Sequence, residues 1–274
     1  MGVDTMSRAR AVIHFVVGFC GCFTALGFAA SDASLPSAKE IVAQYDEALG
    51  GRDAIMRHTS TTTRGTMEAH DGTTVVRLPL VYYARAPFQR LEKVSLPNGA
   101  GDVLNGFDGE IAWSFDPRPG PTGGAQISSG NDRESAKRDA DFYYPLTELS
   151  WFRSMETVGI ENYEGLSCYR LNGINNWNKV NNHFYDVKTH LLDGYEFESP
   201  LGLTHEIFSD YRRIDGVLVA AKQTVKVKGK DGSWNVLYVL TFDSITFNDV
   251  DPAVFALPGA VRALAEKQTA GTKP

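Results

Sequence analysis

The sequence has 274 residues, of which 43% are hydrophobic and 22% are charged, and its formal net charge is −6. A chain of this length and composition can bury a sizeable core by packing alone, without disulfides or a structural metal. The acidic balance disfavours nucleic acids and anionic membrane surfaces as direct partners, because both attract basic patches.

The first 30 residues have the layout of a secretory signal peptide. Arg8 and Arg10 form a positive start, a largely apolar stretch follows, and small residues precede Asp32. Two other interpretations stay open: a transmembrane anchor, since the stretch approaches the length of a bilayer span, and a lipoprotein signal ending at Cys22. Glycines within the stretch favour cleavage. We therefore expect a signal peptide at 1–30, a periplasmic protein, and no membrane span after cleavage.

An amphipathic helix is expected directly after a short leader. Ser37 and Glu40 have the spacing of a capping box, in which each side chain satisfies an amide of the first turn. Apolar residues then recur at helical spacing from Ile41 to Leu49, and Gly50-Gly51 ends the helix.

Beyond residue 60 the pattern alternates with a period of two, which is typical of half-buried strands. Turn signals such as Asp71-Gly72 and Asp215-Gly216 separate the segments and indicate hairpins. The expected strands are 61–69, 75–84, 88–96, 103–107, 110–116, 156–162, 166–174, 179–186, 191–199, 203–213, 217–228 and 233–247.

Helices are expected to interrupt this sheet and to cover one face of it. Asn131 can cap a helix over 132–141, a second short helix is expected over 145–153, and a weak helix is expected from Ala260. There is no internal linker and no repeat of fixed period, so we expect one domain over 31–274.

The order of these elements resembles a known family of exported proteins. The helix ends in Ala48-Leu49-Gly50-Gly51, and a run from Phe107 to Trp113 follows the first strands. The chain closes with Asp215-Gly216-Val217, Ile245 to Asn248 and Phe255 to Pro258. This pattern is similar to the LolA-like superfamily of outer-membrane lipoprotein-sorting proteins, over almost the whole chain after the signal.

The resemblance implies a mainly β fold with a few helices (α+β). The sheet would be an incomplete, curved antiparallel β-barrel with helices covering its concave side. It also implies a cavity that holds acyl chains or other apolar ligands. No residue aligns confidently with a binding position of the family, so the resemblance assigns no site.

Aromatic side chains are the candidates for ligand binding, because apolar walls let a lipid tail leave water. The chain has 15 Phe, 11 Tyr and 4 Trp, and packing within the core is the default interpretation of each. The residues that we expect to line a cavity are Trp113, Phe115, Trp151, Phe152, Phe184, Tyr195 and Phe197.

The register of the hairpin after residue 186 predicts which residues of its two strands face the cavity. If Val187 to His190 is a four-residue loop, Phe184 opposes Asp193. One face would then carry Val180, Phe184, Leu191, Tyr195 and Phe197 as the inner wall, and the solvated face would carry Asn181, His183, Tyr185, Glu196 and Glu198.

Catalytic chemistry has weaker support in the sequence. After signal cleavage Cys168 is the remaining cysteine, and no metal-type spacing, nucleophile elbow or phosphate loop occurs, so no metal, cofactor or catalytic residue is predicted. His205 either pairs with Glu196 on the outer face or lies inside near Phe197. The spacing of apolar residues around His205 favours the inside position, where it could serve as a general base.

Three functions follow, in order of preference. The first is a periplasmic carrier or chaperone, not an enzyme, for a lipid, a lipidated protein or another apolar ligand. The second is an enzyme that uses the same cavity with His205 as acid or base. The third is an envelope sensor or scaffold that binds an envelope protein partner through the lysines of one strand, Lys222, Lys226, Lys228 and Lys230. The alternative interpretation of these lysines is that they only protect a sheet edge from aggregation.

Overall fold

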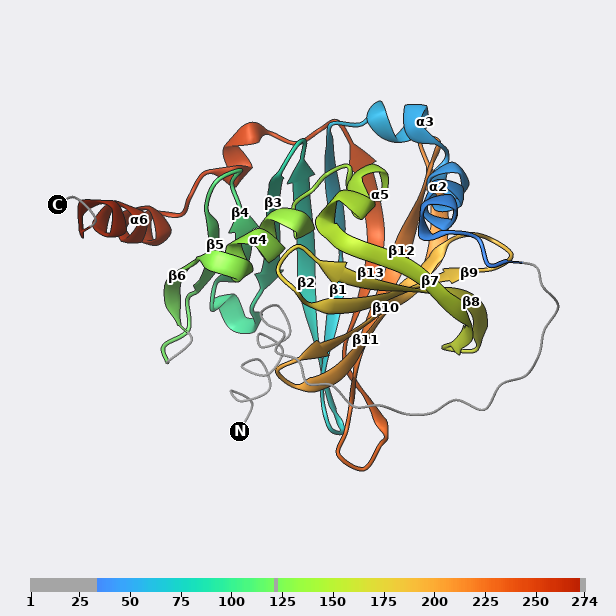
Figure 1. Ribbon diagram of the computed structural model, residues 1–274. Helices are drawn as coiled ribbons and strands as arrows, with labels where there is room; N and C mark the ends of the chain where they lie inside the picture. The colour runs from blue at the N-terminus through green and yellow to red at the C-terminus, as the bar shows by residue number, and fades with distance from the viewer. Residues whose placement is uncertain (1–33, 121–122, 272–274) are drawn as a thin grey trace.

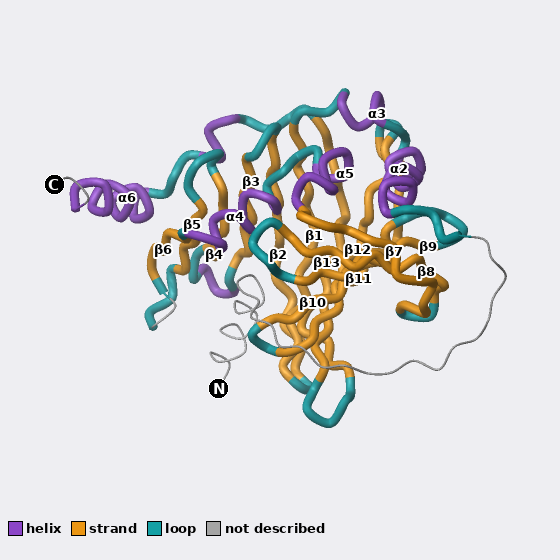
Figure 2. Tube along the Cα trace, in the orientation of Figure 1, coloured by secondary structure: helices purple, strands orange, loops and turns teal. Residues whose placement is uncertain are grey.

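The structure is a computed structural model that describes residues 34–120 and 123–271. The expected signal peptide at 1–30 lies outside these residues. Within them, thirteen strands form one antiparallel sheet that is not closed into a complete barrel (Figures 1 and 2). The predicted fold class, an open and curved antiparallel sheet with a few helices, is confirmed.

The sheet consists of two meanders joined by the first and last strands. The N-terminal meander contains β1 (Ser60–Asp71), β2 (Thr74–Arg85), β3 (Gln89–Ser95), β4 (Asp102–Phe107), β5 (Ala112–Asp116) and β6 (Gly124–Ser128). The C-terminal meander contains β7 (Phe152–Tyr163), β8 (Leu166–Asn175), β9 (Val180–Asp186), β10 (Leu192–Ser199), β11 (Gly202–Ile214), β12 (Val217–Lys228) and β13 (Trp234–Phe247). β1 pairs with β13, which leaves β6 and β7 as the two edges.

The hairpins form where the sequence supplies residues that tolerate a positive φ. Asp215 and Gly216 have φ angles of 45° and 88° in the turn between β11 and β12. A two-residue turn with positive φ at both positions matches the right-handed twist of the flanking strands. Between β1 and β2, Gly72 supplies a positive φ of 57° at the first position of the turn.

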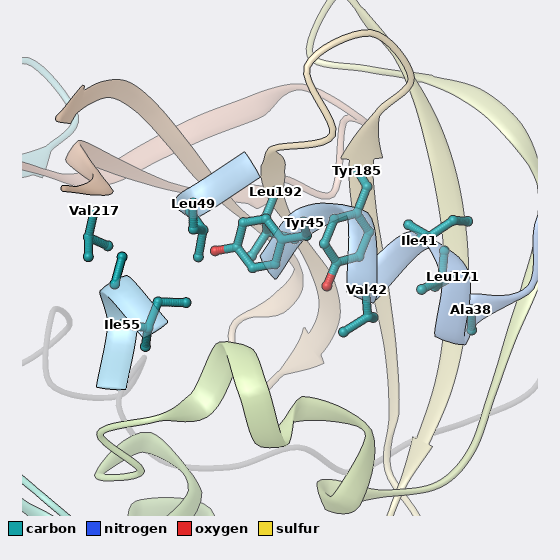
Figure 3. Packing of buried hydrophobic residues seen from close by; sticks show 11 residues of the cluster. Ala38, Ile41, Val42, Tyr45, Leu49, Ile55, Leu171, Tyr185, Leu192 and Val217 are labelled. Atoms are coloured by element: carbon teal, nitrogen blue, oxygen red, sulfur yellow. The ribbon is translucent and has the colours of Figure 1, made fainter. Parts of the chain in front are cut away.

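Helix α2 (Ala38–Leu49) covers one end of the concave side. Its capping box is formed, with Ser37 Oγ accepting from the Glu40 amide and the Glu40 carboxylate accepting from the Ser37 amide. Tyr45 packs edge-on against Tyr185 of β9, with ring centroids 5.4 Å apart (Figure 3). The buried face of α2 joins Leu171, Leu192 and Val217 in one apolar cluster, which fixes the helix on the sheet.

The middle of the chain adds the other covering helices. α3 (Arg52–Met56) follows α2, and α4 (Gly130–Asp139), α5 (Tyr144–Thr147) and the 3₁₀ turn η2 (Glu148–Trp151) lie between β6 and β7. The predicted cap of α4 is wrong: the N-cap residue is Ser129, one residue before the helix starts at Gly130. The second predicted helix ends at Trp151, because the chain becomes strand β7 at Phe152.

The C-terminal segment covers the other side of the N-terminal meander. The 3₁₀ turns are η1 (Pro97–Gly99) and η3 (Pro252–Phe255), and α6 (Gly259–Gly271) ends the described chain. Phe255 and Val261 are buried and pack with Leu91 and Trp113 in one apolar cluster. α6 lies beside β6 at one end of the molecule (Figure 1).

Candidate functional site

Two adjoining cavities occupy the concave side of the sheet. One has a volume of about 530 Å³ and the other about 380 Å³. They share six lining residues, which are Ala84, Tyr195, Val219, Ala220, Gln223 and Phe242. Both volumes fall in the range of small-molecule sites in proteins.

The central strands supply the apolar wall of the larger cavity. Tyr238, Leu240 and Phe242 alternate along β13, so their side chains share one face. Tyr82 of β2 meets Phe242 edge-on, with ring centroids 5.9 Å apart. An acyl chain or ring system could leave water against this wall.

A band of charged side chains crosses the same cavity. Arg90 of β3 pairs with Glu92 at 3.3 Å and lies over the Tyr82 ring, 5.2 Å from its centroid. Arg138 of α4 pairs with Asp139 at 2.9 Å. The lining of the cavity is therefore amphipathic, since it contains both apolar rings and charged groups.

Glu206 of β11 is the carboxyl in this band that makes no ion pair within the described part of the chain. Its carboxylate accepts a hydrogen bond from the Gln223 amide, and none of the described residues forms an ion pair with it. Burial raises the pKa of Glu206 to about 7, and the negative charge of Asp139 adds to this, whereas Arg138 and Arg90 oppose it.

A second polar cluster lies where η2 meets the cavity wall. The Glu148 side chain is completely buried and accepts hydrogen bonds from the Tyr185 hydroxyl at 2.6 Å and 2.7 Å. The same carboxylate lies 2.5 Å from Nδ1 of His183. His183 lines the larger cavity, and no described residue bonds its Nε2 atom. The cluster anchors the covering segment to β9 and holds the imidazole in one orientation.

The structure brings two of the predicted ligand-binding residues, Tyr195 and Phe197, together on the wall of the larger cavity. Phe152 lies near them, buried edge-on against His183 with ring centroids 5.1 Å apart. Trp151 lies apart, where its indole N–H donates to the Asp141 carboxylate at 2.8 Å.

The predicted register of the β9–β10 hairpin is wrong. Asp186 does oppose Leu191, but the register shifts between Leu192 and Gly194. Such a bulge inserts one residue and moves every later side chain to the other face. Tyr195 therefore pairs with His183, and the inner wall carries Asn181, His183 and Tyr185 in place of Val180 and Phe184.

Phe184 accordingly lies on the outer face of the sheet. Its ring stacks on Tyr163 with centroids 4.1 Å apart, in a small cluster with Cys168 and Ile207. Ligand contact at Phe184 would require a ligand on this outer face, away from the two cavities.

Trp113 and Phe115 pack under the C-terminal segment. They belong to the apolar cluster of Phe255 and Val261. Gly106 lies opposite Trp113. A glycine is needed there, because a Cβ atom would come within 2.6 Å of the indole ring. Trp113 also borders a third, smaller cavity of about 80 Å³ beside α4, but neither residue lines the two large ones.

The inside position favoured for His205 is wrong. His205 pairs with Glu196 across the hairpin, and its Nε2 atom lies 3.0 Å from that carboxylate. Nδ1 lies 2.9 Å from Glu164, and the ring lies against Trp234 with centroids 3.9 Å apart. His205 is thus on the outer face, outside the cavity, and cannot act there as acid or base.

The lysine-bearing strand is not an edge. β12 lies between β11 and β13, so the interpretation of its lysines as protection of a sheet edge is wrong. Lys226 forms an ion pair with Glu164 on the outer face, and Lys228 lies over the Trp234 ring at 5.9 Å. Lys222 and Lys230 are exposed.

Sequence reasoning missed several residues of the site, notably Tyr238, Phe242, Arg138 and Glu206. The alternation of Tyr238, Leu240 and Phe242 was a readable signal for one wall. Arg138 offered no comparable signal, because a polar helix such as α4 has the composition of a solvated surface. Over the described ranges, no group of three His, Cys, Asp or Glu side chains could hold a metal ion, and no helix is long and apolar enough to cross a membrane.

The comparisons with known proteins concern the fold. No family model matches the sequence, and no curated protein matches it. A LolA superfamily protein from Nitrosomonas europaea superposes with a TM-score of 0.56 at 12% identity, over 81% of this chain and 99% of that one. A DUF1329 family protein from Desulfovibrio piger superposes with a TM-score of 0.56 at 14% identity, over 80% of this chain and 96% of that one.

A third solved structure, described as an outer membrane lipoprotein-sorting protein domain from Vibrio parahaemolyticus, gives a TM-score of 0.53 at 13% identity, over 80% of this chain and 94% of that one. The chain therefore has a LolA-like fold, as its sequence pattern predicted. At these identities the likeness is one of fold alone.

Proposed function

We propose that this protein is a periplasmic carrier that binds an amphiphile, either a lipid or the acyl part of a lipidated protein, within the concave side of its sheet. The observation that carries the proposal is the pair of adjoining cavities of about 530 and 380 Å³, walled by aromatic and aliphatic side chains. An apolar chain buried there gains the free energy of leaving water, about 25 cal/mol per Å² of apolar surface.

Two further observations support the location and the class of ligand. The N-terminal segment has the layout of a secretory signal, and one structure of like fold is described as a lipoprotein-sorting domain. The band of charged side chains in the lining suits a ligand that has a head group as well as a chain.

The test is native mass spectrometry of the protein purified from its host without detergent, followed by organic extraction. A stoichiometric adduct that extracts as a lipid supports the carrier. The same spectrum gives the mature mass, which lacks residues 1–30 if the signal is cleaved there, or begins at a lipid-modified Cys22 if the protein is anchored.

A variant with a filled cavity makes this test specific. Ala220 lines both cavities, so Ala220→Trp places an indole where they meet and should abolish the adduct. Ala253→Trp adds the same ring at an exposed position of η3 and should leave the adduct unchanged. An apo mass for the parent protein, repeated after incubation with envelope lipids, would contradict the carrier.

An enzymatic function is a second candidate because of His183. Its imidazole lines the cavity while Glu148 fixes the opposite ring nitrogen, which is the arrangement of a base and its orienting carboxylate. The reaction would be water attack on an ester of a bound acyl chain. Hydrolysis of p-nitrophenyl laurate by the parent protein but not by His183→Gln would support it, and equal rates for both would exclude it.

A further inference from the structure

Glu206 occupies an unusual position within the cavity. In β11 it lies opposite Tyr195 of β10 and Val225 of β12, so its side chain emerges between these two strands on the concave face. The Gln223 amide donates one hydrogen bond to it, and no described Lys, Arg or His makes an ion pair with it. A carboxylate without a cation is costly in a cavity with restricted access to water.

The two arginines whose charges act on Glu206 are already paired with other carboxylates. Arg90 of β3 has Glu92, and Arg138 of α4 has Asp139. The Asp, Glu, Lys and Arg side chains that line the cavity are thus two arginines, their two partner carboxylates and Glu206, so Glu206 leaves one negative charge in excess.

Aromatic rings complete the surroundings of the carboxyl group. Tyr82 of β2, Tyr195 of β10 and Tyr238 of β13 line the same cavity. Burial chiefly raises the pKa of Tyr238 and of Tyr195, and the charge of Glu206 contributes to both, which indicates that the rings and the carboxylate are near neighbours. The faces of such rings attract cations.

From this geometry we infer that the ligand is a cationic amphiphile, whose amino or quaternary ammonium head lies against Glu206 and the tyrosine rings while its chain extends along the apolar wall. The inference rests on the proposed carrier function and adds the chemical class of the cargo. A single excess carboxylate matches a single positive head group. The apolar side chains of β13 line the same cavity as Glu206 and can contact the chain of the ligand.

Binding of a cation should then depend on pH. Burial raises the pKa of Glu206 to about 7, so at lower pH the group is protonated and offers no charge to the ligand. Affinity for a permanent cation should rise as the pH increases through about 7 and level off above it. A change of one pKa unit on binding corresponds to about tenfold in affinity.

The experiment compares twelve-carbon amphiphiles that differ in the head group. Dodecyltrimethylammonium, dodecyl sulfate and a neutral dodecyl polyethylene glycol ether are titrated below their micelle concentrations by calorimetry, from pH 5.5 to 8.5. The first two heads keep their charge over this range. The proteins are the parent, Glu206→Gln, and Glu198→Gln as the matched control, because Glu198 is an exposed carboxyl on the neighbouring strand.

We expect the cation to bind the parent and Glu198→Gln at least about tenfold more tightly than the neutral ether at pH 8, and the preference to vanish in Glu206→Gln. Equal binding of all three heads, or tighter binding of the sulfate, would overturn the inference while leaving the carrier intact. Failure of every amphiphile to bind would overturn the carrier itself. If Glu206→Gln does not fold, the pH profile of the parent decides: a flat profile overturns the inference.

Discussion

His205 and Glu206 are consecutive residues of β11, yet they lie on opposite faces of the sheet in contrasting surroundings. On the outer face, His205 lies between Glu196 and Glu164, and Lys226 bonds the second of these carboxylates. On the inner face, Glu206 has a single amide donor and a cavity in front of it.

The two surroundings shift the pKa values of the carboxyl groups in opposite directions. A hydrogen bond with His205 lowers the pKa of Glu196, although burial opposes it. For Glu164 burial also acts to raise the pKa, but bonds with Lys226 and His205 prevail and lower it. Burial raises the pKa of Glu206. Charges that are paired within the protein stabilise the fold, whereas an unpaired charge at a cavity is available to a ligand.

The largest effect on stability should come from a fully paired group on the inner side. Glu148→Ala removes the acceptor of the Tyr185 hydroxyl and the partner of His183, both buried. We expect a loss of about 3 kcal/mol in the free energy of unfolding, measured by urea denaturation. Glu266→Ala, at an exposed position of α6, is the control. A loss below about 1 kcal/mol would show that pairing does not determine stability on this face.

Glu206→Gln should instead raise the free energy of unfolding at alkaline pH. The folded pKa of about 7 exceeds the ordinary 4.5, so the folded state holds this proton more tightly than the unfolded state. The parent therefore loses stability as pH rises from about 4.5 to 7, and Gln removes this loss. We expect a gain of about 2 kcal/mol at pH 8, allowing for partial access of water, and almost none at pH 4.5. Equal stability of parent and variant at pH 8 would mean that Glu206 is compensated by the protein.

His205→Leu should have a smaller, destabilising effect. It removes two hydrogen bonds with carboxylates on the outer face, for a loss of about 1–2 kcal/mol at pH 7. Glu164 and Glu196 have lowered pKa values, so the stability they contribute is present above about pH 4.5 and is lost as the pH falls through their folded pKa values. Acid unfolding followed by circular dichroism should be less steep in His205→Leu, and an unchanged slope would contradict the assigned role.

Lys226→Gln should have the smallest effect. The ion pair with Glu164 is about a quarter exposed at both partners, and such pairs contribute about 0.5 kcal/mol. Thermal unfolding at low and high salt should give a difference between parent and variant that shrinks with salt. A large difference that persists in high salt would assign Lys226 a packing role instead.

Much of the fold could be predicted from the sequence because its local signals agree with one another. The capping box at Ser37, the Asp-Gly turns and the alternating segments each correspond to an element of the structure. β6 was missed because Gly124 to Ser128 follows a loop rich in proline and glycine and has little apolar alternation.

The site was harder to predict because both faces of the sheet carry apolar residues, so apolar spacing does not show which face lines the cavity. Ile207 is apolar and suggested an inward face for His205, but it packs outside with Tyr163 and Phe184. The bulge at Asp193 then moved Tyr195 onto the face of His183, and no turn signal marks it. Glu206 could not be singled out at all, because its lack of an ion-pair partner among the described residues depends on side chains from other strands and a helix.

The pairing of β1 with β13 has a consequence for the order of folding. Within each meander, neighbouring strands are joined by short connections, so most of their contacts are local in sequence and can form quickly. The seam between β1 and β13 instead joins Thr61 to Phe247, at opposite ends of the described chain. Closing so long a loop is slow, and until it closes both halves expose an unpaired strand. We therefore expect the docking of β13 to limit the rate of folding and the two half-sheets to be the species most prone to aggregate.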